Sequence, residues 1–155
     1  MKRKSKAMCG FSYDHYQYIL EKAKKKFSIV KFHEFDETNQ KKQLILRHDI
    51  DFCIESAYKI AKMEYKEGIQ STFFMLLNSP FYNIFSDDEH ELVSKILEMG
   101  HDLGLHYFIP EKITIKKNQI KHIINQTKIM EILFDIKIKV LSPHLVRRLK
   151  NFPNI

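Results

Sequence analysis

The apolar positions of this 155-residue chain follow two periods, one typical of helices and one typical of buried strands. Short apolar runs rich in β-branched and aromatic residues predict strands, and apolar positions three and four residues apart predict helices. The predicted strands cover about residues 43–49, 70–77, 101–106 and 137–141. The predicted helices cover about residues 12–26, 52–67, 86–99 and 115–134.

Residues at the helix ends support this alternation of helices and strands. Ser86 followed by Glu89 is typical of a helix start, and Gly68 and Gly100 each end a helix directly before a strand. Helices that alternate with strands imply right-handed crossovers and a mostly parallel sheet. We therefore expect one α/β domain over residues 11–155, with about four parallel strands flanked by helices, after a disordered basic start at residues 1–10.

Polar side chains follow each predicted strand. Because the carboxyl ends of parallel strands share one edge of the sheet, these side chains should lie close together. The first strand contributes His48, Asp49 and Asp51, the second contributes Asn78 and Ser79, the third contributes His106, and the fourth contributes Ser142 and His144. Aspartate and histidine are natural ligands of Zn²⁺ and related metals, so this edge is the candidate site.

The segment Arg47–Asp51 carries the densest charge at that edge. Side chains two apart on a strand share a face, so Arg47, Asp49 and Asp51 should point one way and His48 the other. Two carboxylates within about 7 Å repel each other unless a cation or a shared proton lies between them. A divalent metal would leave the second carboxylate free as a base, whereas a surface turn with solvated acids is the simpler alternative.

The two histidines of the third strand have different expected roles. His101 and His106 would lie about 16 Å apart along a regular strand, too far to share one metal. His106 lies at the carboxyl end and is the better candidate ligand. We expect His101 to interact with the last carbonyl groups of the preceding helix.

Composition narrows the classes of protein. Lys and Arg exceed Asp and Glu by 26 to 19, a net charge of +7, but the lysines are spread along the chain apart from clusters at 1–6 and 22–26. We interpret them as solvated surface charges and expect no nucleic-acid function. Cys9 and Cys53 lack metal-type spacing, and no signal-peptide core or membrane-length apolar run is present. A cytoplasmic protein without a membrane span is the expectation.

Several segments together resemble a known family. They are Leu46-Arg47-His48-Asp49-Ile50-Asp51, Ser71-Thr72-Phe73-Phe74, Ser79-Pro80-Phe81-Tyr82-Asn83 and Gly100-His101-Asp102-Leu103-Gly104-Leu105-His106. Over about residues 11–148 the chain resembles the polysaccharide deacetylase (NodB-homology) family, in its branch with an Arg-His-Asp-x-Asp first motif. The resemblance implies a distorted (β/α) barrel of about seven strands that removes acetyl groups from sugars with a divalent metal, most often Zn²⁺.

The resemblance also implies roles for individual residues. Asp49 matches the general base, Asp51 the carboxylate ligand and His106 the first histidine of the metal-binding pair. The family's second histidine follows a few residues later, but residues 107–110 here are Tyr-Phe-Ile-Pro. Ser142-Pro143-His144 resembles a later segment that carries a histidine, so His144 is the candidate third ligand, although it is followed by Leu-Val-Arg where that branch often has Arg-Pro.

The substrate contacts expected at this site come from the first two strand ends. Arg47 or His48 would orient Asp49, with a structural ion pair as the alternative role of Arg47. Asn78 lies at the end of the second strand. Tyr82, with Phe81, would stack on a sugar ring, although packing in the core is the alternative for Phe81.

Only four strands are readable, so the chain is expected to be a partial barrel, truncated at its C-terminus and with exposed strand edges. An acetylated sugar or polysaccharide is the expected substrate of an active enzyme. One alternative is a degenerate, non-catalytic remnant that binds a glycan or a protein. Another treats Asp49-Ile50-Asp51 as the metal motif of a nucleotide-sugar transferase, which is disfavoured because no glycine-rich turn precedes it.

Overall fold

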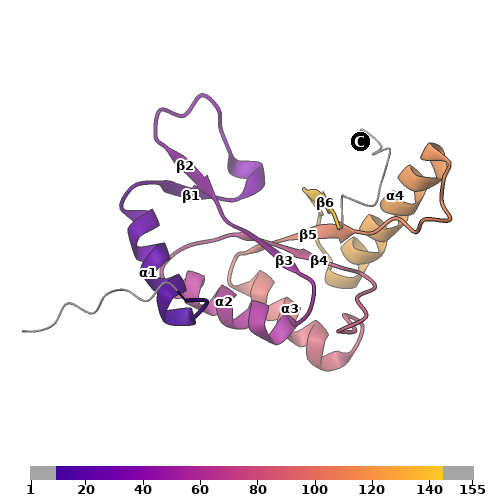
Figure 1. Cartoon of the computed structure of the whole chain (residues 1–155), viewed down its shortest axis with the longest axis horizontal. Coiled ribbons are helices and arrows are strands. Elements are labelled where there is room, and N and C mark those ends of the chain that lie inside the picture. The colour runs from indigo at the N-terminus through magenta and orange to yellow at the C-terminus, as the bar shows by residue number, and fades with distance from the viewer. Residues whose placement is uncertain (1–9, 145–155) are drawn as a thin grey trace, which may run out of the picture.

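The computed structural model describes residues 10–144 and has a four-stranded parallel sheet at its centre. The sheet curls into a half-barrel with helices packed against it, so the expected α/β fold is confirmed (Figure 1). The strands, in both chain and spatial order, are β3 (Arg47–Ile50), β4 (Thr72–Met75), β5 (Asp102–Tyr107) and β6 (Leu141–Pro143). The connecting helices are α2 (Ile54–Lys66), α3 (Asp87–Glu98) and α4 (Lys116–Phe134). Within the described residues β3 and β6 each pair on one side only, which leaves an open edge at both ends of the sheet.

The first predicted strand is two strands in the structure. Residues 43–45 form β2 (Gln43–Ile45), which pairs in parallel with β1 (Ser28–Val30) in a separate two-stranded sheet. Leu46 lies between the sheets, where its carbonyl accepts a hydrogen bond from Thr72 at 3.3 Å, and Arg47 then begins β3. The short 3-10 helix η1 (Phe32–Glu34) follows β1. Helix α1 (Tyr13–Lys24) precedes this small sheet and is capped by Ser12, whose side chain accepts a hydrogen bond from the N–H of His15.

The last strand begins later than predicted. Helix α4 ends at Asp135, which adopts a left-handed conformation with φ 50°, and residues 137–140 connect it to β6. Strand pairing aligns His106 with Ser142, and this register places His144 directly beyond the end of β6. The strand predicted at 137–141 lies a few residues later: Ile138 packs against the core, and contact with the sheet begins at the carbonyl of Val140, which accepts a hydrogen bond from the N–H of Leu105 at 3.2 Å.

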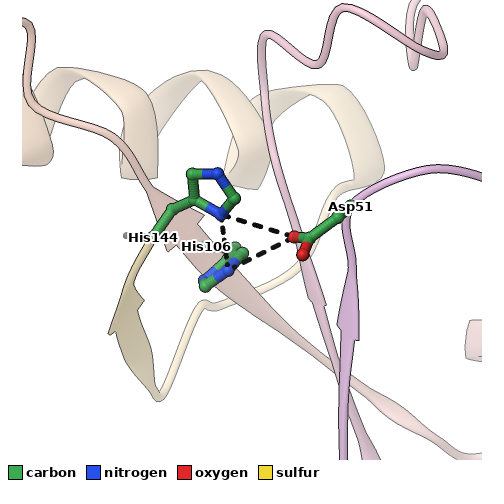
Figure 2. A group of neighbouring side chains, drawn as sticks. All are labelled: Asp51, His106 and His144. Carbon is green, nitrogen blue, oxygen red and sulfur yellow. Dashed lines mark hydrogen bonds and ion pairs between the residues drawn. The ribbon is translucent and has the colours of Figure 1, made fainter. Parts of the chain in front are cut away.

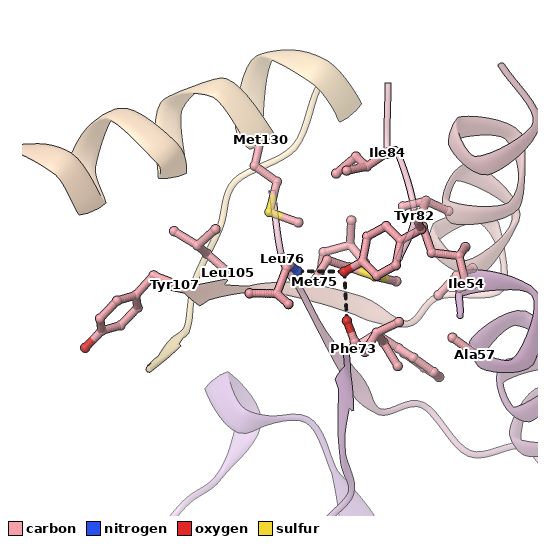
Figure 3. Close-up of a cluster of buried hydrophobic side chains, with 14 of the residues drawn as sticks. Ile54, Ala57, Phe73, Met75, Leu76, Tyr82, Ile84, Leu105, Tyr107 and Met130 are labelled. Carbon is pink, nitrogen blue, oxygen red and sulfur yellow. Dashed lines mark hydrogen bonds between the residues drawn. The ribbon is translucent and has the colours of Figure 1, made fainter. Parts of the chain in front are cut away.

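The core lies between the sheet and its helices (Figure 3). Both faces of β4 are buried, as expected of a parallel strand covered on both sides. Gly68 and Gly100, which follow α2 and α3, have positive φ angles of 67° and 85°, consistent with their predicted role as helix stops. None of the described helices is long and apolar enough to cross a lipid bilayer.

The buried face of α4 combines apolar and polar residues. Its buried positions are Ile123, Met130 and the polar Gln119 and Gln126. Both glutamines donate hydrogen bonds to backbone carbonyls, Gln119 to Ile113 at 2.9 Å and Gln126 at 3.4 Å to Phe108. These hydrogen bonds connect the buried face of the helix to the loop that precedes it.

Candidate metal centre

Three side chains from three strand ends converge at the carboxyl edge of the sheet (Figure 2). Oδ1 of Asp51 lies 3.5 Å from Nε2 of His106 and 3.4 Å from Nδ1 of His144. The two histidine nitrogens are 3.1 Å apart. Such a group of one carboxylate and two imidazoles can hold a metal ion. The two histidines, His106 and His144, are 38 residues apart in the chain.

Contacts between β5 and β6 orient the imidazole of His106 and fix the backbone of His144. His106 Nδ1 lies 3.1 Å from the Ser142 carbonyl, an acceptor, so Nδ1 carries the proton and Nε2 presents a lone pair to the group. The His144 backbone N–H donates to the carbonyl of Tyr107 at 2.8 Å. Burial lowers the pKa of His106, which favours the neutral imidazole that binds metals.

The carboxylate of Asp51 has unmet bonding capacity. Its Oδ1 atom is buried and accepts no hydrogen bond from the described residues. A buried carboxylate oxygen without a donor is costly, and here it faces the lone pair of His106 Nε2. A cation among the three atoms would bind both the Asp51 oxygen and the lone pair of His106 Nε2. The three side chains therefore fit a divalent metal.

Asp49 lies beside this group but is held by a different partner. Arg47 donates two hydrogen bonds to it, from Nε to Oδ1 at 2.7 Å and from Nη2 to Oδ2 at 2.8 Å. Arg47 also donates to the hydroxyl of Ser142 and stacks on Phe74, with its guanidinium carbon 4.7 Å from the ring centroid. The strand pattern predicted this shared face of Arg47 and Asp49 correctly, and the two parallel hydrogen bonds fix the orientation of the Asp49 carboxylate.

His48 points to the other face of β3, as the alternation predicted, and therefore does not contact Asp49. Its Nε2 lies 2.7 Å from Oε1 of Glu64, and its ring packs on Phe73 with centroids 4.7 Å apart. The expectation that His48 orients Asp49 or faces the substrate is not supported by this position, because the sheet lies between them.

Glu64 is the centre of a buried polar cluster that the sequence interpretation missed. Its side chain is fully buried, and it accepts hydrogen bonds from Tyr16 and from Ser71, the latter at 2.5 Å. Burial raises the pKa of this carboxyl, but the contacts with His48, Ser71 and Tyr16 outweigh burial, and the pKa lies below its usual value. A signal was present, because residue 64 continues the helical spacing of the buried residues 54, 57 and 61.

His101 belongs to this inner cluster and not to the metal centre, as its distance from His106 predicted. The Ser71 N–H donates to its Nδ1 at 3.1 Å, so Nε2 carries the proton and donates to the carbonyl of Ala61 at 3.0 Å. Ala61 lies within α2, so the predicted contact with the end of the preceding helix α3 was wrong. The side chain is buried at the opposite end of β5 and joins two neighbouring βα units.

Tyr82 and Phe81 have the reverse of their expected roles. Tyr82 is buried, and its hydroxyl donates to the carbonyl of Ile50 at 2.7 Å and accepts from the N–H of Leu76 at 2.9 Å (Figure 3). Phe81 is 61% exposed and packs against Phe52, which is 66% exposed, with ring centroids 4.7 Å apart. The tyrosine thus fixes the strand end beside Asp51, and the phenylalanines present the aromatic surface.

The loop after β4 also contacts the candidate metal centre, at the backbone of Asp51. Ser79, which the sequence placed at this edge, donates its hydroxyl proton to the carbonyl of Asp51 at 3.1 Å. Asn78 is exposed in the same loop, and its side chain forms no hydrogen bond within residues 10–144. Ser79 therefore supports the metal centre, while Asn78 is placed near it without a fixed role.

At this edge, three side chains that can hold a cation lie near a separate carboxylate, Asp49, whose two oxygens accept hydrogen bonds from Arg47. Metal-assisted hydrolysis needs those two elements. Comparison of the sequence with protein-family models and with curated proteins gives no match.

Proposed function

We propose that this protein is a metal-dependent hydrolase that removes acetyl groups from a sugar or polysaccharide. The observation that carries the proposal is the convergence of Asp51, His106 and His144 on one point, with Asp49 held beside them by Arg47. The substrate class comes from the resemblance of these segments to the polysaccharide deacetylase family. The second imidazole comes from β6, which offers a physical replacement for the histidine missing at residues 107–110 and favours a catalytic role over a degenerate remnant.

The spacing of the three atoms is compatible with Zn²⁺. Tetrahedral zinc with bonds of about 2.0–2.1 Å keeps its ligand atoms roughly 3.3 Å apart. The three separations here are 3.1, 3.4 and 3.5 Å, close to that value. Three protein ligands leave the fourth position for water or substrate, as in catalytic zinc sites.

Each residue has a distinct task in the hydrolysis. Asp51, His106 and His144 would hold the metal, which when bound polarises the acetyl carbonyl and lowers the pKa of water. Asp49 removes a proton from the attacking water as the water oxygen adds to the acetyl carbon. The carbon–nitrogen or carbon–oxygen bond to the sugar then breaks, acetate leaves, and the sugar amine or hydroxyl takes up the proton from Asp49.

Arg47 prepares Asp49 for this role. Both carboxylate oxygens accept from the guanidinium, but a carboxylate offers about four lone-pair directions, so one remains for the water. The contact from Arg47 to Ser142 links the base to β6, whose carbonyl at Ser142 also orients His106. The base and one metal ligand are therefore positioned by the same strand.

The exposed pair Phe52 and Phe81 provides a surface for the sugar ring. Phe52 follows Asp51 directly, and the N–H of Phe81 donates at 3.1 Å to Ser79, which is bonded to Asp51. Aromatic faces pack well on the apolar C–H faces of sugar rings, and exposed rings beside a polar site are typical of ligand contacts. We assign sugar stacking to this pair in place of Tyr82.

The test is acetate release from acetylated chitin oligosaccharides by zinc-loaded protein. Asp49→Asn should abolish release while leaving zinc content unchanged, and Asp87→Asn, at the exposed start of α3, serves as the matched control. Release from the parent protein and the control but not from Asp49→Asn supports the proposal. Absence of release from the zinc-loaded parent protein, or equal rates in all three, would contradict it.

The compartment that we propose is the cytoplasm. Cys53 is an exposed free thiol, which suits a reducing environment. Cys9 lies outside the described residues. Retention of a reduced Cys53 in protein isolated from the native cell under thiol-blocking conditions would test this assignment.

A further inference from the structure

Five lysines line a shallow, open cleft between the end of α1 and the segment before β2. In Figure 1 these two segments lie at the opposite end of the molecule from α4. Lys24, Lys25 and Lys26 come from the end of α1 and the turn after it, and Lys41 and Lys42 precede β2. Phe27 and Ser28 complete the lining, and the cleft has a volume of about 410 Å³. Among residues 10–144, no carboxylate lines it.

Backbone hydrogen bonds fix the two lysine segments relative to each other. The N–H of Ser28 donates to the carbonyl of Lys42 at 2.9 Å, and the parallel pairing of β1 with β2 continues from there. The N–H groups of Lys26 and Phe27 both donate to Ala23 at 2.9 Å, which closes the end of α1. The lysines are therefore carried on ordered backbone from two separate parts of the chain.

The charge in this cleft is largely uncompensated. Lys24 pairs with Glu67, with Nζ 3.2 Å from Oε2. The four remaining lysines form no ion pair with any residue in the range 10–144. Like charges on one concave surface raise the electrostatic energy of the free protein and attract a multiply charged anion.

We propose that this lysine cleft binds a compact polyanion of the oligophosphate class. The cleft volume lies within the range of small-ligand pockets, about 300–1,000 Å³. A membrane surface needs a broad basic face and a nucleic-acid strand an extended basic groove, whereas these lysines come from two short segments, residues 24–26 and 41–42. Lysine ammonium groups bind phosphate as mobile point charges, so they suit a ligand with many equivalent oxygens. The site is separate from the metal centre and does not depend on the proposed deacetylase activity.

Isothermal titration calorimetry with inorganic tripolyphosphate tests this proposal on the full chain at low ionic strength. The parent protein should bind one equivalent, and Lys25→Glu/Lys41→Glu should weaken binding at least tenfold. The control Lys117→Glu/Lys121→Glu makes the same change in net charge on exposed positions of α4 and should alter the affinity less than twofold. Backbone amide shifts on titration should concentrate at residues 24–28 and 41–43.

Three results would overturn the proposal. One is the absence of tripolyphosphate binding at millimolar concentration, and another is equal weakening by the two double variants, which would indicate general attraction to a basic protein. The third comes from separate titrations with a single-stranded RNA and with vesicles containing anionic phosphatidylserine. Tighter binding of either through the same lysines would replace the oligophosphate with that partner.

Discussion

The guanidinium of Arg47 holds both oxygens of Asp49, at 2.7 and 2.8 Å, and donates a further hydrogen bond to Ser142 on the far edge of the sheet. Replacing Arg47 with Lys keeps the charge but removes the planar fork, so Asp49 would lose its fixed orientation. We expect Arg47→Lys to lower kcat for acetate release by about 10- to 100-fold, as loss of an orienting partner beside a metal centre typically does. Zinc affinity should change little, because Arg47 contacts none of the three candidate ligands.

A control variant distinguishes whether Arg47 positions Asp49 for catalysis or only stabilises the fold through their ion pair. Lys59→Arg, in the exposed pair with Glu55 on α2, is the control for a change of cation type and should leave kcat unaltered. If Arg47→Lys changed only the melting temperature and not kcat per folded molecule, Arg47 would have a structural role alone.

Tyr82→Phe removes one hydroxyl that satisfies two buried backbone groups, the carbonyl of Ile50 and the N–H of Leu76. Leaving buried polar groups unpaired costs about 1–3 kcal/mol, so the free energy of unfolding should fall by that amount. Chemical denaturation measures it, with Tyr65→Phe at an exposed position of α2 as the control, for which we expect a change below about 0.5 kcal/mol. If the free energy of unfolding fell no more in Tyr82→Phe than in the control, the assignment of Tyr82 to the core would be contradicted.

The sequence predicted which side chains lie together at the carboxyl edge of the sheet better than it predicted the limits of the strands. Asp49, Asp51 and His106 could be placed together because parallel strands end at a common edge, whatever their length. The break at Leu46 could not be read from the sequence, because the residues on both sides of it are extended and no glycine or proline separates them. The burial of Tyr82 and exposure of Phe81 also escaped prediction, because loop conformation, and not periodicity, decides which of two adjacent aromatic rings faces the core.

His101 makes stability sensitive to acid. Burial lowers its pKa below the ordinary value of 6.5, so the folded protein binds a proton at this site less readily than the unfolded chain. The contribution of neutral His101 to the free energy of unfolding is therefore fully present above pH 6.5. It is lost as the pH falls through the lowered pKa of the folded state. We expect His101→Gln to be less stable at pH 7 but to show a shallower decline in the free energy of unfolding between pH 6.5 and pH 5.

Urea denaturation at several pH values measures this difference. His122→Gln is the control, because the side chain of His122 on α4 forms no hydrogen bond with the described part of the chain. A decline in His101→Gln as steep as in the parent protein would show that the acid sensitivity arises elsewhere.

The exposed aromatic pair predicts a selective loss of substrate binding. Phe81→Ala removes a ring that is 61% exposed and packed on Phe52, so its truncation should cost little stability. We expect KM for an acetylated oligosaccharide to rise about fivefold or more, since loss of a stacked ring is worth roughly 1 kcal/mol, with kcat nearly unchanged. Phe85→Ala, 54% exposed in the same loop, provides the control, and an equal rise of KM in both variants would argue against a specific platform.

The central claim is that Asp51, His106 and His144 form one metal centre, and a zinc titration against a chromophoric chelator tests it most directly. The parent protein should bind one equivalent, and His144→Gln should weaken binding at least 100-fold while the fold, checked by circular dichroism, is retained. His33→Gln, whose ring instead pairs with Asp102 at 2.7 Å, should bind zinc like the parent. Absence of stoichiometric binding by the parent protein, or equal affinity in His144→Gln, would contradict the account.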